Sequence, residues 1–297
     1  MYQKNELHLK AYAKINLGLD VVRRLENGYH EVKMVMQTVR IYDELVMKKV
    51  DEPGIAITTN VRFLPVDENN LVYKAVKMLM DEFNIKEGVE IYLEKYIPVA
   101  AGMAGGSADC AAALVGMNKL FSLKLSTEEL MKRGATLGAD VPYCILRGTA
   151  LCEGIGEIIT PLPPAPECFV VVAKPTVSVS TKFVYENLVL DENTKHPDID
   201  GMVEAIKNND LLGVTSRMGN VLEDVTVKEY PQIQRIKEVM KEHGAINALM
   251  SGSGPTVFGI FDDYDKACEV VELMKQDADV KRSYLTKFFH KYPNKNK

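Results

Sequence analysis

A glycine-rich segment at residues 98–108 leads directly into an alanine-rich stretch that favours a helix. Gly102, Gly105 and Gly106 have no Cβ, so the backbone can approach a ligand closely and its N–H groups can point at phosphate oxygens. The positive end of a helix that begins after Ser107 adds to the attraction for anions. The segment therefore predicts a phosphate-binding loop, although a flexible turn before a closely packed helix is the simpler alternative.

The spacing of these glycines differs from the two commonest nucleotide-binding patterns. A Walker loop requires a Gly-Lys-Ser/Thr ending, and no lysine follows these glycines. The Gly-x-Gly-x-x-Gly pattern of dinucleotide-binding folds is also absent from the segment. If the loop binds phosphate, it belongs to another class of fold.

Lys14 and Asp140 are the charged residues that could carry chemistry beside such a loop. Asp140 lies in Gly138-Ala-Asp-Val-Pro142, which we expect at the C-terminal end of a helical segment, where the helix dipole disfavours a carboxylate unless a cation compensates it. Asp140 could orient or deprotonate a hydroxyl, and Lys14 could neutralise a phosphoryl group in transfer. Taken singly, each has a plainer interpretation, as a turn aspartate and a surface lysine.

The combination of these features favours phosphoryl transfer. That reaction needs a phosphate cradle, a cation, a carboxylate that orients the hydroxyl and usually Mg²⁺. The sequence supplies the first three, and the hydroxyl of Ser107 is the candidate metal ligand.

The elements that must position these residues follow from hydrophobic periodicity. Residues 7–22 alternate as one long strand, or two strands that share a bend, and place Lys14 and Asn16 on the same face. Glu26-Asn27-Gly28 predicts a reversal, with a return strand over 32–39. Further elements are expected along the chain: helices over 69–83, 127–138, 202–207, 214–222 and 233–243, strands over 89–93, 169–173 and 256–261, and a glycine turn at 251–255.

Composition indicates an ordinary globular protein. The chain has 297 residues, 46% hydrophobic and 26% charged, with a net charge of −5. The acidic balance argues against a nucleic-acid partner, and no apolar stretch is long enough to predict a membrane span. Five scattered cysteines and the absence of a signal-like N-terminus favour a cytoplasmic location. The proline-rich segment 161–166 is the best candidate for a domain boundary.

Five motifs, taken together and in order, resemble those of the GHMP kinase superfamily. They are Ala13–Leu17, Gly28–His30, Pro98–Ser107, Gly138–Pro142 and Ser251–Gly254. The first, second and fourth are similar to the branch that phosphorylates a cytidine diphosphate conjugate of methylerythritol in non-mevalonate isoprenoid biosynthesis. The resemblance spans about residues 7–261, nearly the whole chain.

The resemblance implies a two-domain α+β fold. Residues 1–160 would form an ATP-binding and catalytic domain like domain 2 of ribosomal protein S5, and residues 161–297 a ferredoxin-like substrate-binding domain. The implied reaction is ATP- and Mg²⁺-dependent phosphorylation of the 2-hydroxyl of the small-molecule substrate. The implied partners exclude nucleic acid and membrane, and the protein would be a monomer or a homodimer.

The resemblance also assigns roles to individual residues. Lys14 and Asp140 would form the catalytic pair, and Ser107 would reach Mg²⁺. The ATP phosphates would be wrapped by Pro98, Val99, Ala100, Ala101, Gly102, Met103, Ala104, Gly105, Gly106, Ser107 and Ala108. The substrate contacts would be Asn16, Tyr29, His30, Thr181, Tyr185, Gly252 and Gly254.

Among the substrate contacts, His30 would hydrogen-bond the cytosine while Tyr29 and Tyr185 stack on it. Without the resemblance, packing is an equal interpretation of both tyrosines, and Thr181 could instead cap a helix that begins near Lys182. Asp109 departs from the family pattern because it places a carboxylate beside the phosphate site. It would repel ATP unless it faces away or meets a cation.

Two other functions fit parts of this pattern. A GHMP kinase for mevalonate or homoserine would share the loop and the catalytic pair, but its substrate has no base to stack on Tyr29 or to pair with His30. A non-catalytic nucleotide-binding sensor could keep the loop and lose Lys14 or Asp140, and this sequence has both.

Replacing Asp140 tests its role as the group that orients or deprotonates the hydroxyl. We expect Asp140→Asn to lower kcat by at least about 100-fold with little effect on ATP affinity, because the amide cannot accept the proton. Steady-state kinetics measure this, and a kcat close to that of the wild type would contradict the assignment.

Overall fold

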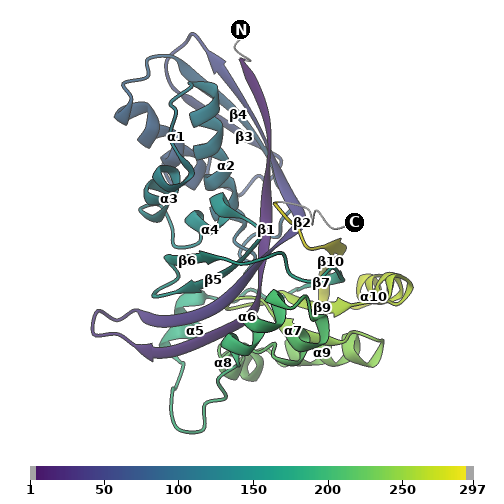
Figure 1. The fold of residues 1–297 in the computed structure, drawn as a ribbon. Helices are drawn as coiled ribbons and strands as arrows, with labels where there is room; N and C mark the ends of the chain where they lie inside the picture. Colours follow the sequence, from purple (N-terminus) through teal and green to yellow (C-terminus); the bar gives the residue numbers. More distant parts are fainter. Residues whose placement is uncertain (1–4, 292–297) are drawn as a thin grey trace. The chain divides into compact units, whose positions relative to one another are not determined.

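The computed structural model describes residues 5–291, which form two compact units (Figure 1). Unit 1 contains the described residues up to Ala13, together with 41–99 and 104–146. Unit 2 contains 14–40, 100–103 and the described residues from Arg147 onward. Unit 2 thus takes residues from both sides of the predicted boundary at 160/161, and that boundary stays a prediction.

Two long N-terminal strands supply residues to both units. They are β1 (Glu6–Arg24) and β2 (His30–Val50), which pair with each other. The turn at Glu26–Gly28 lies between them, as the sequence predicts, and Gly28 has a φ of +85°. The alternating pattern of the first strand is confirmed over its full length. Around Lys14–Leu19, however, both faces of β1 are buried, so its polar residues there do not face solvent.

Unit 1 combines strands with four helices. Residues 44–50 of β2 run antiparallel to β4 (Gly88–Glu94), and β3 (Ile55–Thr59) runs parallel to β4. The helices are α1 (Leu71–Glu82), α2 (Gly105–Leu120), α3 (Thr127–Ala135) and α4 (Val141–Leu146). α2 packs against the other three helices.

Local signals explain why α1 and α2 begin where they do. Asn70 caps α1 by accepting a hydrogen bond from the N–H of Val72 at 2.9 Å, which confirms the predicted helix. α2 begins at Gly105, before the predicted start after Ser107, because Ala108 already donates to the carbonyl of Ala104 at 2.8 Å. Two predicted loop glycines and Ser107 therefore form the first turn of this helix.

Asp140 lies in the turn between α3 and α4, directly before the second helix, and the expectation that it lies at the C-terminal end of the first is wrong. α3 ends at Ala135, and α4 begins at Val141, where the N–H of Cys144 donates to the carbonyl of Asp140 at 3.0 Å. Pro142 falls in the first turn of α4, a position where its missing N–H costs nothing. The sequence motif therefore starts a helix, and the dipole at that end favours a carboxylate.

Unit 2 contains two groups of strands. Residues 34–37 of β2 pair antiparallel with β5 (Thr149–Glu153), which pairs with β6 (Ile158–Pro161). A separate antiparallel sheet has the order β10-β7-β9-β8. Its strands are β7 (Phe169–Pro175), β8 (Asn247–Met250), β9 (Val257–Phe261) and β10 (Val280–Lys287).

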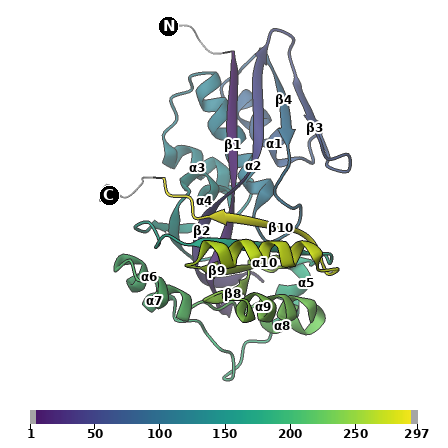
Figure 2. The same ribbon diagram turned by 90° about the vertical axis from the view of Figure 1, so that its right-hand side faces the viewer.

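The helices of unit 2 complete an α+β fold. They are α5 (Thr181–Glu186), α6 (Ile199–Lys207), α7 (Leu211–Ser216), α8 (Glu223–Glu229), α9 (Gln232–Glu242) and α10 (Tyr264–Gln276). α9 and α10 both pack on the second sheet, and Figure 2 shows α10 lying along it. Among residues 5–291, every helix is too short or too polar to cross a bilayer.

The predicted helix over 214–222 is wrong in its second half. α7 ends at Ser216, and the following backbone pairs with β1 instead of continuing the helix. Leu19 donates to the carbonyl of Gly219 at 2.9 Å, and Val221 donates to the carbonyl of Leu19 at 3.0 Å. These long-range bonds replace the bonds that a helix would have made locally.

The capping box of α3 gives a test of local stability. The hydroxyl of Ser126 accepts a hydrogen bond from the N–H of Glu129 at 3.1 Å. The carboxylate of Glu129 accepts one from the N–H of Ser126 at 2.7 Å. We expect Ser126→Ala to lower the free energy of unfolding by about 1 kcal/mol, measured by urea denaturation. Ser126→Asp, which also caps, should retain most of the stability, and equal losses in both variants would contradict this explanation.

Candidate active site

Lys14 and Asn16 are the buried polar pair at the centre of the site in unit 2. Their exposed fractions are 5% and 0%. The ammonium of Lys14 donates to Oδ1 of Asn16 at 2.8 Å, and Nδ2 of Asn16 approaches Sδ of Met34 at 3.3 Å. Asn16 therefore holds the lysine in place, and its predicted contact with substrate stays a prediction.

The glycine-rich loop is attached to this strand by its backbone. The N–H of Lys14 donates to the carbonyl of Met103 at 3.2 Å. Residues 100–103 belong to unit 2, whereas 98–99 and 104–108 belong to unit 1. The unit 2 part of the loop is thereby fixed beside the lysine.

The two glycine segments of the sequence meet in unit 2. The hydroxyl of Ser251 donates to the carbonyl of Gly102 at 2.9 Å. Gly102 has a φ of +74°, and a Cβ there would lie 2.2 Å from the carbonyl oxygen of Ser251. Gly252 has a φ of +59°, and its Cβ position lies 3.6 Å from Oδ1 of Asn16. The second glycine turn therefore lies against both the loop and the Lys14–Asn16 pair.

Asn220 holds that glycine turn and was missed in the sequence. Its Nδ2 donates to the carbonyls of Met250 and Gly252 at 2.9 and 2.8 Å, and its Oδ1 accepts from Leu222. Its neighbour Gly219 and its own poor fit to a helix interior were the available signals. The turn is completed by Gly254, with a φ of +89°.

Thr181 lies next to the same turn. Its hydroxyl is 2.7 Å from the hydroxyl of Ser253. The alternative that Thr181 caps α5 is wrong, because Ser180 is the cap and accepts from the N–H of Phe183. The Thr181 hydroxyl is therefore directed to the site and not to the helix.

His30 and Tyr185 form an aromatic pair in unit 2. Their ring centroids are 5.1 Å apart at an interplanar angle of 40°. Burial, with a smaller contribution from the charge of Arg24, lowers the pKa of His30 below its usual value. The imidazole is therefore neutral at pH 7 and offers one donor and one acceptor. Tyr29, which follows the hairpin turn, is 62% exposed.

The first turn of α2 is the part of the loop that belongs to unit 1. Its N-cap residue, Ala104, makes no side-chain capping bond, so the first N–H groups of the helix can serve another partner. A Cβ on Gly106 would approach only Leu71 Cδ1, at 3.9 Å, so the surface there is open. Oγ of Ser107 lies 3.9 Å from the Cβ position of Gly138, next to the segment that carries Asp140. These features suit a phosphate group.

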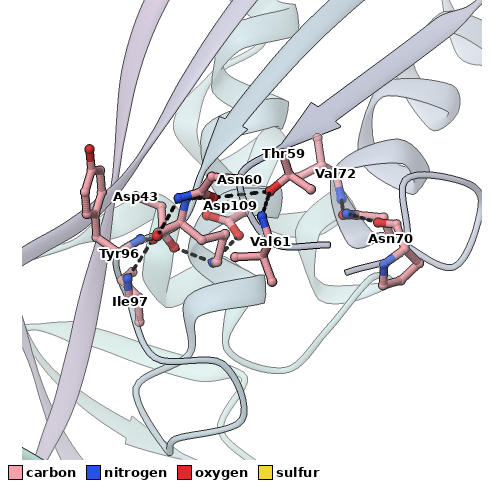
Figure 3. Close-up of polar contacts among 11 residues, drawn as sticks. Asp43, Thr59, Asn60, Val61, Asn70, Val72, Tyr96, Ile97 and Asp109 are labelled. Atoms are coloured by element: carbon pink, nitrogen blue, oxygen red, sulfur yellow. Dashed lines mark hydrogen bonds and ion pairs between the residues drawn. The ribbon is translucent and has the colours of Figure 1, made fainter. Parts of the chain in front are cut away.

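Asp109 meets a cation beneath this turn, which answers the question that its charge raised. Lys95 lies between two carboxylates, with its Nζ 2.5 Å from Oδ2 of Asp109 and bonded also to Oδ2 of Asp43. We call these three residues the buried ion cluster. Oδ1 of Asp43 accepts the N–H groups of Tyr96 at 2.5 Å and Ile97 at 2.8 Å (Figure 3).

The buried ion cluster was not found from the sequence. Burial alone would lower the pKa of Lys95, but the attraction of Asp109 and Asp43 outweighs it and raises that pKa. Burial raises the pKa of Asp109, and the attraction of Lys95 opposes that rise. One oxygen of Asp109, Oδ1, has no hydrogen-bond partner within the described chain.

Lys14 and Asp140 lie in different units, so their pairing stays a prediction. Asp140 is half-buried. Within residues 5–291, no three or more His, Cys, Asp or Glu side chains gather in a way that could hold a metal ion.

Comparison with known proteins identifies the family. Residues 70–148 match the model of the GHMP kinase N-terminal domain, and residues 194–278 match the GHMP kinase C-terminal model. The chain belongs to the GHMP kinases. The first match covers the loop-bearing helices of unit 1, and the second covers helices α6–α10 together with strands β8 and β9 of the second sheet.

Several GHMP relatives carry the same name. A 4-diphosphocytidyl-2-C-methyl-D-erythritol kinase of Lachnoclostridium phytofermentans is 59% identical, over 95% of this chain and 97% of that protein. The enzyme of that name from Lachnospira eligens is 57% identical, over 95% of this chain and 98% of that protein.

Solved GHMP structures agree with the fold. A 4-(cytidine 5'-diphospho)-2C-methyl-D-erythritol kinase superposes with a TM-score of 0.82 at 30% identity, covering 95% of this chain and 99% of that one. A homoserine kinase from Cytophaga hutchinsonii has a TM-score of 0.77 at 22% identity, with 98% and 96% covered. The second match shows the fold alone.

The close approach at Gly102 gives a test of the site's construction. We expect Gly102→Ala to lower the free energy of unfolding by at least about 2 kcal/mol, because a Cβ meets the Ser251 carbonyl and a positive φ is strained for alanine. Chemical denaturation measures the change. Gly106→Ala, where the space is open, should cost less than half as much, and the reverse order would show that the described contact is wrong.

Proposed function

We propose that this protein is an ATP-dependent kinase that phosphorylates the 2-hydroxyl of 4-diphosphocytidyl-2-C-methyl-D-erythritol, giving the 2-phosphate and ADP. The observation that carries the substrate assignment is the His30–Tyr185 pair, which lies in the same unit as Lys14 and the second glycine turn. A substrate that carries a nucleobase needs such a pair, whereas mevalonate and homoserine do not. The names of the 59% and 57% identical relatives support the same substrate.

In this proposal, the glycine-rich loop binds the phosphates of ATP. The uncapped N–H groups of the first turn of α2 donate to phosphate oxygens, and Gly106 allows the close approach. As the bond to the γ-phosphoryl group breaks, negative charge grows on the leaving diphosphate. Fixed amide donors stabilise that charge without having to reorganise.

Lys14 and Asp140 act on the acceptor side. Asp140 orients the 2-hydroxyl and receives its proton, and the hydroxyl oxygen attacks the γ-phosphorus. Lys14, kept in place by Asn16 at 2.8 Å, supports the ionised carboxylate and neutralises charge on the phosphoryl group in transfer. The bond to the leaving oxygen breaks, and ADP departs.

Mg²⁺ belongs to the proposal through Ser107. The metal, when bound with ATP, would neutralise the phosphate charge, and the Ser107 hydroxyl offers one oxygen ligand beside the open Gly106. Few protein ligands are needed, because Mg²⁺ keeps several waters and takes phosphate oxygens. A cytoplasmic location is part of the same proposal.

A coupled assay of ADP release tests the substrate. The wild-type protein should release ADP with 4-diphosphocytidyl-2-C-methyl-D-erythritol and at most traces with mevalonate or homoserine. Activity only with mevalonate or homoserine would overturn the proposed substrate but leave the assignment as a kinase intact. No turnover with any of the three, together with ATP binding, would favour a nucleotide-binding sensor.

His30 gives a pH-dependent prediction. The ordinary pKa of histidine is about 6.5, and the pKa of His30 is lower. The imidazole therefore stays neutral at and above that pH, where it can both donate to and accept from cytosine. We expect the KM for the cytidine substrate to be flat above that pH and to rise as the pH falls further, when the acceptor nitrogen is protonated.

The matched control is His30→Gln, which keeps a donor and an acceptor and does not titrate. Its KM should lose the acid rise, whereas His30→Ala should raise KM about tenfold across the whole range, as expected for one lost hydrogen bond. A wild-type rise that persists unchanged in His30→Gln would assign it to another group.

A further inference from the structure

The buried ion cluster of Asp43, Lys95 and Asp109 lies directly beneath the first turn of α2. We propose that Lys95 is a positioning residue for ATP, because it ties the end of β4 to the helix turn whose N–H groups receive the phosphates. This inference rests on the proposed function. Lys95 would act on ATP indirectly, because its contacts hold the backbone on either side of the loop.

On the β4 side, Asp43 holds both the lysine and the chain that leads into the loop. One carboxylate oxygen bonds the ammonium of Lys95, and the other accepts the N–H groups of Tyr96 and Ile97. These two residues immediately precede Pro98, where the glycine-rich loop begins. The direction in which the chain enters the loop is therefore fixed by a side chain from β2.

On the helix side, the ammonium contacts the first two turns of α2. Its partner Asp109 lies four residues after Gly105, so the ion pair is made one turn along the helix. A Cβ on Gly105 would lie 3.3 Å from Nζ of Lys95 and 3.1 Å from Cγ2 of Ile97. The backbone of Gly105 thus lies close to the ammonium of Lys95, and a Cβ at this position would make tight contacts with Lys95 and Ile97.

Burial makes stability alone a poor explanation of the cluster. The side chains of Lys95, Asp43 and Asp109 are 4%, 0% and 4% exposed, so all three groups lose their hydration. Apolar residues of similar volume are often as stabilising as a buried ion cluster, or more so. The charged groups make directional bonds, and these bonds join specific atoms of β2, of the residue after β4 and of α2.

Lys95→Met tests the proposal. We expect the KM and Kd for ATP to rise at least about tenfold, while the KM for the acceptor changes by less than about threefold. The Kd is measured by calorimetry with a non-hydrolysable ATP analogue, well below the unfolding temperature. Unchanged ATP affinity, or an equal loss for both substrates, would overturn the proposal.

Arg133→Met is the matched control in the same unit. Arg133 bonds Glu82 and joins α3 to α1 through a partly exposed pair, away from the loop. Its loss should lower the unfolding temperature without changing ATP affinity. If Arg133→Met raised the KM for ATP as much as Lys95→Met does, the loss of ATP affinity in both variants would come from a general destabilisation of unit 1.

A second pair of variants covers the case in which Lys95→Met does not fold. Asp109→Ala cuts the bond to α2 and leaves the Lys95–Asp43 pair intact, and we expect ATP affinity to fall about fivefold. Asp109→Asn keeps an acceptor for Lys95 and should recover most of that loss. Equal affinities for Asp109→Ala and the wild type would overturn the proposal.

The two proposals fail in different ways. If the wild type does not phosphorylate the cytidine substrate, the proposed function fails, but the comparison of ATP affinities among the variants still tests Lys95. If the wild type is active and the Lys95 and Asp109 variants bind the ATP analogue normally, only the positioning role is wrong.

Discussion

The construction of unit 2 depends on the contact between the two glycine segments. Gly102 and Ser251 are 149 residues apart in the chain, yet no Cβ fits between the backbone at one and the carbonyl at the other. Because the second segment is held by Asn220, which lies beside β1, the strand that carries Lys14 is linked to both segments. The positions of these parts are therefore set together, and Lys14 is placed by backbone contacts and by Asn16.

In unit 1, the backbone of the loop is held by charged side chains. In the proposed function, the first turn of α2 presents its N–H groups to a phosphate, and the carboxylate of Asp109 lies one turn further along the helix. Lys95 compensates that carboxylate from below, where it is shielded from solvent. Electrostatic compensation in unit 1 and close backbone packing in unit 2 thus achieve the same end, a fixed backbone next to reacting groups.

Sequence reasoning succeeded where local signals suffice. The starts of the helices expected from residues 69 and 127 and the turn at Gly28 each lie within a few residues of the observed position. The atoms that determine them, including the caps at Asn70 and Ser126, are neighbours in the chain. It failed at 217–222, where the backbone bonds β1 instead of itself. It also missed that Asp140 directly precedes a helix, although a proline two residues later, at Pro142, suits the first turn of one.

The site shows the same division. Residue types and motifs predict Lys14, the glycine loop and His30 as site residues, and the family to which those motifs point is confirmed. Asn220, Asp43 and Lys95 were missed because each holds a partner at least 14 residues away and no spacing rule links the two. Side chains that act by holding other parts of the backbone leave little trace in a single sequence.

The sharing of β1 and β2 between the units has a consequence for synthesis on the ribosome. All of unit 1 is available once residue 146 has left the exit tunnel. Residues 14–40 belong to unit 2, and residues 34–37 find their strand partner only when 149–152 emerge. During translation, the apolar side chains of residues 14–40 therefore stay uncovered until the later residues emerge. In this interval the nascent chain is open to binding by a chaperone or to premature association.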